Sequence, residues 1–296
     1  MVNEKFDWNK QRNTSEAFSD TFAFLRLNFP LLVKVHASMT LPAVLVIAGF
    51  FILLFPADFS LLRAIDSSPF TDQGAMEAKF KTFLISSLFG SLVCMVVSTN
   101  TLAAVHVSAT AGHQSATLSA IRDTLSKNFF NLVVSKIIMA VAVGISYLFM
   151  LVPGLLVYSL FSCVEMLIFQ HGYGAGPAIK RSYSSVLKSF GQPLLVNGGL
   201  LLIYMVIKTA LGSLAPMYEW LTSFFFTEIQ ADSTLFIVLK SLEAFNTILG
   251  YSMFMIPAAG AGILYFSLKE ELTKAQIMGR IREIGNPQPK PSSNHE

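Results

Sequence analysis

The feature that most constrains the fold is a set of long apolar runs without charge. Residues 41–55 and 137–164 contain no Asp, Glu, Lys or Arg. A helix needs about 20 apolar residues to cross a bilayer, and these runs approach or exceed that length. Charged residues make up only 13% of the chain, whereas soluble domains carry about 25%. The sequence therefore excludes a typical soluble enzyme and predicts a polytopic membrane protein.

We expect an all-α membrane protein with about six transmembrane helices arranged as three hairpins. Apolar runs of spanning length cover residues 31–56, 82–106, 130–151, 153–171, 193–215 and 244–267. Pro153 and Gly154 are the break between the third and fourth runs, which predicts a chain reversal there. The predicted organisation is a cytoplasmic segment with an interfacial helix (1–30), a six-span membrane domain (31–267), a cytoplasmic amphipathic helix (268–285) and a disordered tail (286–296).

Basic residues are distributed unevenly along this predicted topology. With the N-terminus inside, 14 of the 21 Lys and Arg residues fall on the inner side, and four fall on the outer side. Positive charge favours the cytoplasmic side, so we expect both termini to be cytoplasmic. The net charge is only +3, which gives no electrostatic support for nucleic-acid binding.

A pattern repeats before the first, third and fifth spans, aligned on a polar residue followed by Phe. The aligned phenylalanines are Phe29, Phe129 and Phe190. Apolar residues at helical spacing precede each one, and the opposite face is polar. The aligned stripes are Phe18, Phe22 and Leu25; Leu118, Ile121 and Leu125; and Ile179, Tyr183 and Val186. We interpret the pattern as three units, each an interfacial helix plus a membrane hairpin; the alternative is that any loop between spans tends to become amphipathic.

Basic residues on the polar faces of these helices are expected to contact anionic lipid headgroups. They are Arg26, Arg122, Lys127, Lys180, Arg181 and Lys188. Membrane lipids are therefore the first predicted partners. A membrane-protein partner or a second copy of the chain is also compatible with the sequence.

Glu165 is the most informative single residue, because a carboxylate inside a membrane span is costly and is usually paired or functional. Counted from the predicted turn at residues 152–153, Glu165 and Lys136 differ in depth by about 4.5 Å, which a Lys side chain can bridge. We predict that the two form an intramembrane pair. Three roles stay open: a structural ion pair, a substrate or proton site, or an unpaired Lys that extends toward the interface.

Other candidate sites give weak signals. His36, His106, His113 and His171 fall on the predicted cytoplasmic side, but their spacing does not bring them together, so we expect no metal and no cofactor. Cys94 and Cys163 lie in apolar runs and are predicted to be buried hydrophobic residues. Lys34 and Lys208 are expected to extend toward opposite membrane faces. Small residues at 198–199 and 258–262 are expected to allow close helix packing. No nucleophile with a positioned base is evident, so we expect no enzyme.

Residues 152–190 resemble a known family. Pro153 and Gly154 open a span, the run 178–183 reads Ala-Ile-Lys-Arg-Ser-Tyr, and Leu187 and Phe190 precede the next span. This resembles the YciC-like bacterial inner-membrane proteins and the related membrane domain of some glycerophosphodiester phosphodiesterases. The resemblance implies a multi-helix protein of the bacterial inner membrane without established chemistry. Relatives often carry an acidic residue just before the motif, where this chain has Gln170 to Tyr173.

Two functions follow from these features. The first is a non-enzymatic inner-membrane protein that organises the envelope or acts as a scaffold in contact with anionic lipid. The second is a lipid-handling or small-molecule transporter or permease, suggested by the repeated hairpins and by Glu165. Polar residues in the spans are few, which disfavours a hydrophilic pathway but is compatible with lipid transport.

Overall fold

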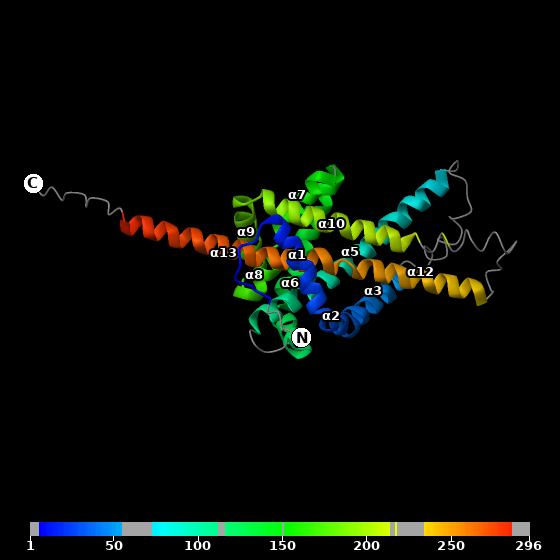
Figure 1. The fold of residues 1–296 in the computed structure, drawn as a ribbon. Coiled ribbons are helices and arrows are strands. Elements are labelled where there is room, and N and C mark those ends of the chain that lie inside the picture. The colour runs from blue at the N-terminus through cyan, green and yellow to red at the C-terminus, as the bar shows by residue number, and fades with distance from the viewer. Residues whose placement is uncertain are drawn as a thin grey trace, which may run out of the picture.

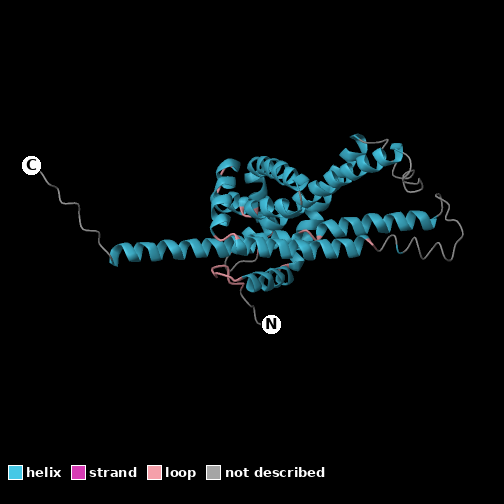
Figure 2. Cartoon of the chain, turned by 90° about the horizontal axis from the view of Figure 1, so that it is seen from above, coloured by secondary structure: helices cyan, strands magenta, loops and turns pink. Residues whose placement is uncertain are grey.

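The computed structural model describes residues 6–54, 73–111, 116–149, 151–213, 217 and 234–285. Within these ranges the chain is helical apart from short connections (Figures 1 and 2). The elements are α1 (Thr14–Leu27), α2 (Phe29–Val35), a π-helical turn η1 (His36–Thr40), α3 (Leu41–Leu54), α5 (Gln73–Thr110), α6 (Leu118–Phe149), α7 (Leu151–Phe161), α8 (Val164–His171), α9 (Ala175–Lys188), α10 (Gly191–Gly212), α12 (Thr234–Ser252) and α13 (Met255–Gly285). The predicted disordered tail and His113 lie outside the described residues.

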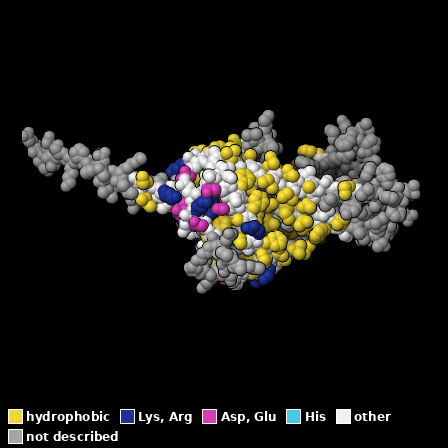
Figure 3. All heavy atoms as spheres, in the orientation of Figure 1, with side chains coloured by type: hydrophobic (Ala, Val, Ile, Leu, Met, Phe, Trp, Pro, Cys, Tyr) yellow, Lys and Arg dark blue, Asp and Glu magenta, His cyan; other side chains and the backbone are white. Residues whose placement is uncertain are grey.

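Six helical stretches are long and apolar enough to cross a membrane, which confirms the predicted fold class. They are Phe29–Phe51, Leu84–Thr110, Leu118–Ser146, Pro153–His171, Gly191–Gly212 and Phe245–Glu271. By helix length and hydropathy the chain is a multi-pass membrane protein. Figure 3 shows apolar side chains over the middle of the molecule, while charged side chains gather toward the end from which α13 protrudes.

Three of these spans are interrupted. The first contains η1 between α2 and α3, the fourth breaks at Ser162 and Cys163, and the sixth breaks at Met253 and Phe254. Pro257 explains the last break, because it has no N–H to donate to the carbonyl of Met253. The amide of Ile256 donates to that carbonyl instead, at 3.0 Å, in a tighter turn.

The hairpin between the third and fourth spans turns earlier than the sequence predicts. Helix α6 ends at Phe149 and α7 begins at Leu151, so the expected reversal at Pro153 and Gly154 is displaced. Both residues lie in the first turn of α7. Proline is tolerated there because the first amides of a helix have no partner within the helix.

Two of the three predicted interfacial helices are separate elements. Helix α1 ends before Asn28, and α9 ends at Lys188 before the turn that leads into α10. The second predicted helix is instead the first part of α6, which continues into the third span without a break. The polar residue before the Phe anchor therefore ends a helix in two units and not in the other.

The buried positions of the first and third units match. Ala17 and Ala178 lie twelve residues before the Phe anchors, and Thr21 and Ser182 lie eight before them; all four are fully buried. In the middle unit, Ile121 occupies the buried position eight residues before Phe129. Parts of the predicted apolar stripes are exposed instead, namely Phe22, Phe29, Phe129 and Tyr183. Each stripe is thus divided between positions buried against protein and exposed positions.

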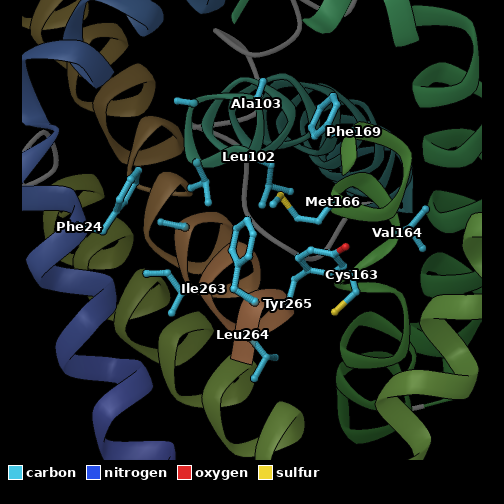
Figure 4. Packing of buried hydrophobic residues seen from close by; sticks show 14 of the residues in the cluster. Phe24, Leu102, Ala103, Cys163, Val164, Met166, Phe169, Ile263, Leu264 and Tyr265 are labelled. Atoms are coloured by element: carbon cyan, nitrogen blue, oxygen red, sulfur yellow. The ribbon is translucent and has the colours of Figure 1, made fainter. Parts of the chain in front are cut away.

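Helix α13 forms the centre of the bundle. Residues 256–268 are all buried, and α13 packs against α1, α5 and α10. Figure 4 shows its side chains, such as Ile263, among those of α1, α5 and α8. A helix that is apolar on every side belongs inside a bundle. The segment 268–285, predicted as a separate helix, continues α13 and extends beyond the bundle (Figure 1).

The segment before α1 ties the two ends of the described chain together. The amide of Arg12 donates to Ser267 Oγ of α13 at 2.9 Å, and Gln192 Nε2 of α10 donates to the Arg12 carbonyl at 2.6 Å. The Arg12 guanidinium pairs with Asp20 of α1 at 2.7 Å. The N-terminal segment and α13 therefore meet at one end of the bundle, here called the termini end; the opposite end is the far end.

Candidate functional site: an intramembrane groove

A groove of about 630 Å³ lies within the membrane-spanning part of the bundle. Its walls come from α5, α6, α7, α8, α10, α12 and α13. Ligand sites commonly occupy about 300–1,000 Å³, so the groove has the size of a binding site. Met205 on its rim is 47% exposed, and the neighbouring surface carries exposed Leu88, Val141 and Leu202. The groove therefore adjoins a surface of exposed apolar side chains.

One face of α5 supplies a polar track along the groove. Ser87, Ser91, Cys94 and Ser98 are spaced by four, three and four residues, so they share one face of the helix. Ser87 and Ser91 are exposed, whereas Ser98 is buried. Eleven residues separate Ser87 from Ser98, or about 16 Å along the helix axis. The track leads from the far end of the bundle into its interior.

The track ends at the intramembrane pair for which the sequence predicts a contact. Lys136 Nζ lies 2.5 Å from Glu165 Oε1. Ser98 Oγ donates to the same carboxylate oxygen at 3.1 Å and accepts a hydrogen bond from Lys136 Nζ at 3.1 Å. Helices α5, α6 and α8 each contribute one member of this triad. The break at Ser162 and Cys163 places Glu165 in the first turn of α8, where a carboxylate is favoured by the helix dipole.

The second oxygen of Glu165 differs from the first in its contacts. Glu165 is 3% exposed, and Oε2 is buried without a hydrogen bond among the described residues. Because Glu165 lines the groove, a small rotation of its carboxylate would present this oxygen to a ligand. A buried acceptor without a partner costs about 1–3 kcal/mol and more when it is charged, so a donor placed here would bind favourably.

A second polar centre lies nearer the far end of the groove. Cys94 Sγ is 3.5 Å from Tyr204 Oη, and Lys208 Nζ lies 4.2 Å from the centre of the Tyr251 ring. All four residues line the groove. Gly90 allows Tyr251 to approach α5, because a Cβ at that position would lie 2.4 Å from Tyr251 Oη.

No family model matches this chain, and no match is found among curated proteins or solved structures. The groove must therefore be interpreted from its own geometry.

The six basic residues predicted to face headgroups are all exposed. They are Arg26, Arg122, Lys127, Lys180, Arg181 and Lys188. In the run 178–183, Ala178 and Ser182 are buried against the bundle, and Ser182 Oγ donates to the carbonyl of Leu160 at 2.7 Å. The Arg181 guanidinium stacks over the Tyr173 ring at 4.7 Å. Lipid contact by these residues stays a prediction.

The described histidines lie apart from the groove and from one another. His171 Nε2 and Tyr265 Oη are 3.2 Å apart, and His36 Nδ1 contacts its own helix at the Leu32 carbonyl. His106 stacks near Phe169. Within the part of the chain that the structure describes, no three His, Cys, Asp or Glu side chains gather as a candidate metal site. Cys163 is buried and Cys94 is partly exposed.

Sequence reasoning missed the serine track and misplaced Lys208. We predict from the sequence that Lys208 extends toward the far membrane face, but its ammonium lies over Tyr251 at the groove wall. The spacing of Ser87, Ser91, Cys94 and Ser98 is a readable signal, since a period of three and four residues marks one helical face. The spacing indicates a polar track into a site only when Lys136 and Glu165 are known to lie beside this face of α5.

Proposed function

We propose that this protein handles membrane lipids. In this proposal a lipid headgroup enters the groove while its acyl chains stay in the bilayer. The observation that carries it is Glu165 Oε2, which lies buried at the inner end of a polar track and has no hydrogen-bond partner in the described part of the chain. The adjoining surface of exposed apolar side chains gives an acyl chain an apolar exit.

The interrupted spans support a binding role. Ser162 and Glu165 flank the α7–α8 break, and Tyr251 and Phe254 flank the α12–α13 break; all four line the groove. Substrate sites of membrane transporters are often built where spans are discontinuous, because broken helices expose backbone groups and helix ends inside the membrane. Of the three interruptions found in the six described spans, two lie at this groove.

The native Cys94 provides a test without altering the groove. We expect delipidated protein in detergent, in a Cys163→Ser background, to react with a maleimide at Cys94. Bilayer lipid added back should slow this reaction several-fold by occupying the groove. Ser91→Phe should prevent the protection by filling the groove, whereas Val141→Phe, an exposed position outside it, should leave protection unchanged. Labelling at the same rate with and without lipid would refute the proposal.

The remaining expectations belong to the same proposal. The chain acts without catalysis, resides in a bacterial inner membrane with its termini in the cytoplasm, and is a YciC-like protein. The resemblance over residues 152–190 and the uneven distribution of Lys and Arg support this proposal. Cysteines introduced at Ser68 and Ser184 test the orientation: a membrane-impermeant reagent applied to intact cells should label the first only.

A second candidate function is a scaffold that organises the envelope through anionic lipid or a protein partner. The exposure of all six predicted headgroup-facing basic residues favours it. Lys180→Gln combined with Arg181→Gln should then release a companion retained in native mass spectrometry of protein taken from its own membrane. Lys136→Met, which alters the groove instead, should retain that companion. A companion retained equally by wild type and the double variant would contradict this role for the basic helix.

A further inference from the structure

The proposal above leaves open which lipid the groove takes. We propose that it selects an anionic phospholipid whose headgroup carries a hydroxyl donor, the chemistry of a phosphoglycerol headgroup. The anionic phosphate would bind at Lys208, and the hydroxyl would donate to Glu165 Oε2. This inference rests on the proposed lipid-handling function and adds the sign and the donor chemistry of the ligand.

The charges that line the groove favour one sign of ligand charge. Its lining residues include two cations, Lys136 and Lys208, and one anion, Glu165. Lys136 is neutralised by Glu165 at 2.5 Å. Lys208 contacts the Tyr251 ring and has no carboxylate partner among the described residues. The positive charge left over at Lys208 favours an anionic ligand, because charge is poorly screened away from water.

The second carboxylate oxygen of Glu165 favours a ligand that carries a hydrogen-bond donor. Glu165 Oε1 already accepts from Lys136 and Ser98, whereas Oε2 accepts from nothing among the described residues. A quaternary ammonium headgroup has no N–H or O–H to offer this oxygen. A glycerol hydroxyl can donate to it, and a hydrogen bond to a charged group contributes about 1.5–3 kcal/mol.

The two centres are separated by a distance that one headgroup can span. Ser98 and Cys94 are one turn apart on α5, Cys94 contacts Tyr204, and Lys208 is one further turn along α10. Two turns of four residues place Ser98 and Lys208 about 12 Å apart along the helix axes. The Lys208 and Glu165 side chains extend from their helices, so the distance between the ammonium and the carboxylate can be shorter than this axial separation. A short, extended headgroup therefore fits both centres better than a single ion.

Competition among three phospholipids with identical acyl chains tests the inference. The purified, delipidated chain is mixed with equal amounts of phosphatidylglycerol, phosphatidylmethanol and phosphatidylcholine, and retained lipid is counted by native mass spectrometry. Phosphatidylmethanol is anionic but lacks the glycerol hydroxyls. We expect phosphatidylglycerol to exceed phosphatidylmethanol, and phosphatidylmethanol to exceed phosphatidylcholine, each by about tenfold, because one hydrogen bond to a charged group contributes on this scale.

Two variants assign the selectivity to its residues. Lys208→Met should reduce the preference for phosphatidylmethanol over phosphatidylcholine to about twofold or less, the loss expected for one charged contact. Glu165→Gln should reduce the preference for phosphatidylglycerol over phosphatidylmethanol while both anionic lipids still exceed phosphatidylcholine. Lys34→Met, an exposed lysine of the first span outside the groove, should match wild type. Lys208 lies at the groove wall, so its variant is informative even if Glu165→Gln folds poorly.

The outcomes separate this inference from the function on which it rests. Equal retention of all three lipids, with Cys94 protected by each of them, would overturn the charge and donor selectivity and leave lipid handling intact. Retention of none, with Cys94 unprotected, would overturn both. A preference for phosphatidylmethanol over phosphatidylcholine that survives Lys208→Met would place the phosphate elsewhere and would also refute the inference.

Discussion

Removing Lys136 should destabilise the protein more than removing its partner. In Lys136→Met, Glu165 keeps only the hydrogen bond from Ser98 and stays buried at 3% exposure. An uncompensated buried charge costs about 3–5 kcal/mol. In Glu165→Gln, Lys136 keeps Ser98 as an acceptor, and its side chain is 14% exposed, so its ammonium can reorient toward water along the open groove. We expect Glu165→Gln to lower the free energy of unfolding by about 1–3 kcal/mol, the cost of losing a hydrogen bond to a charged group.

The double variant makes the test specific to the contact. With both charges gone, the free energy of unfolding should return close to that of Glu165→Gln alone, which implies a coupling as large as the cost of Lys136→Met, about 3–5 kcal/mol. Unfolding is followed by circular dichroism in mixed micelles titrated with SDS. Lys34→Met should change stability by less than about 0.5 kcal/mol, as a surface substitution does. Losses that add to within about 0.5 kcal/mol would refute the pairing argument.

Two further predictions concern packing and the N-terminal cap. Gly260→Ala should lower the free energy of unfolding by about 1–3 kcal/mol through overpacking, because its Cβ would lie 2.0 Å from the buried Leu200. Gly49→Ala has open space around its Cβ and should raise the free energy of unfolding by up to about 1 kcal/mol through helix propensity. Equal melting temperatures for the two variants would contradict this prediction. The hydrogen bonds from Lys10 and from the backbone N–H of Asn13 lower the pKa of Glu16. Glu16 therefore stabilises the folded state fully above the ordinary pKa of about 4.3, and this stabilisation is lost as the pH falls through the lowered pKa of the folded state. Melting temperatures measured against pH should therefore fall more steeply in acid for wild type than for Glu16→Gln.

The fold class was readable from the sequence because membrane solvation acts on whole segments. A span must be apolar over its full length, so six runs indicate six helices even when their ends are displaced. Breaks within spans are less visible: Pro257 signals one, while the break at Ser162 and Cys163 has no proline or glycine beside it. Tertiary packing decides such positions.

The site was readable only in part, for a similar reason. The Lys136–Glu165 contact follows from hairpin depth, which one pair of adjacent helices sets. The groove depends on where α5, α10 and α12 lie relative to that hairpin, and loop charges and span lengths do not specify this arrangement. Lys208 illustrates the difference, since its depth was predictable but the direction of its side chain, toward Tyr251, was not.

Helix α13 is unbroken for 31 residues, from the groove wall to a point well outside the bundle. Ala258 and Ala261 line the groove, and residues 269–285 project beyond the buried part as a rod of about 25 Å. A rigid rod held near one end acts as a lever, so a small tilt of α13 at the groove wall would become a larger displacement at the protruding end. Under the proposed function, a ligand that tilted α13 would therefore move a part of the chain far from the groove.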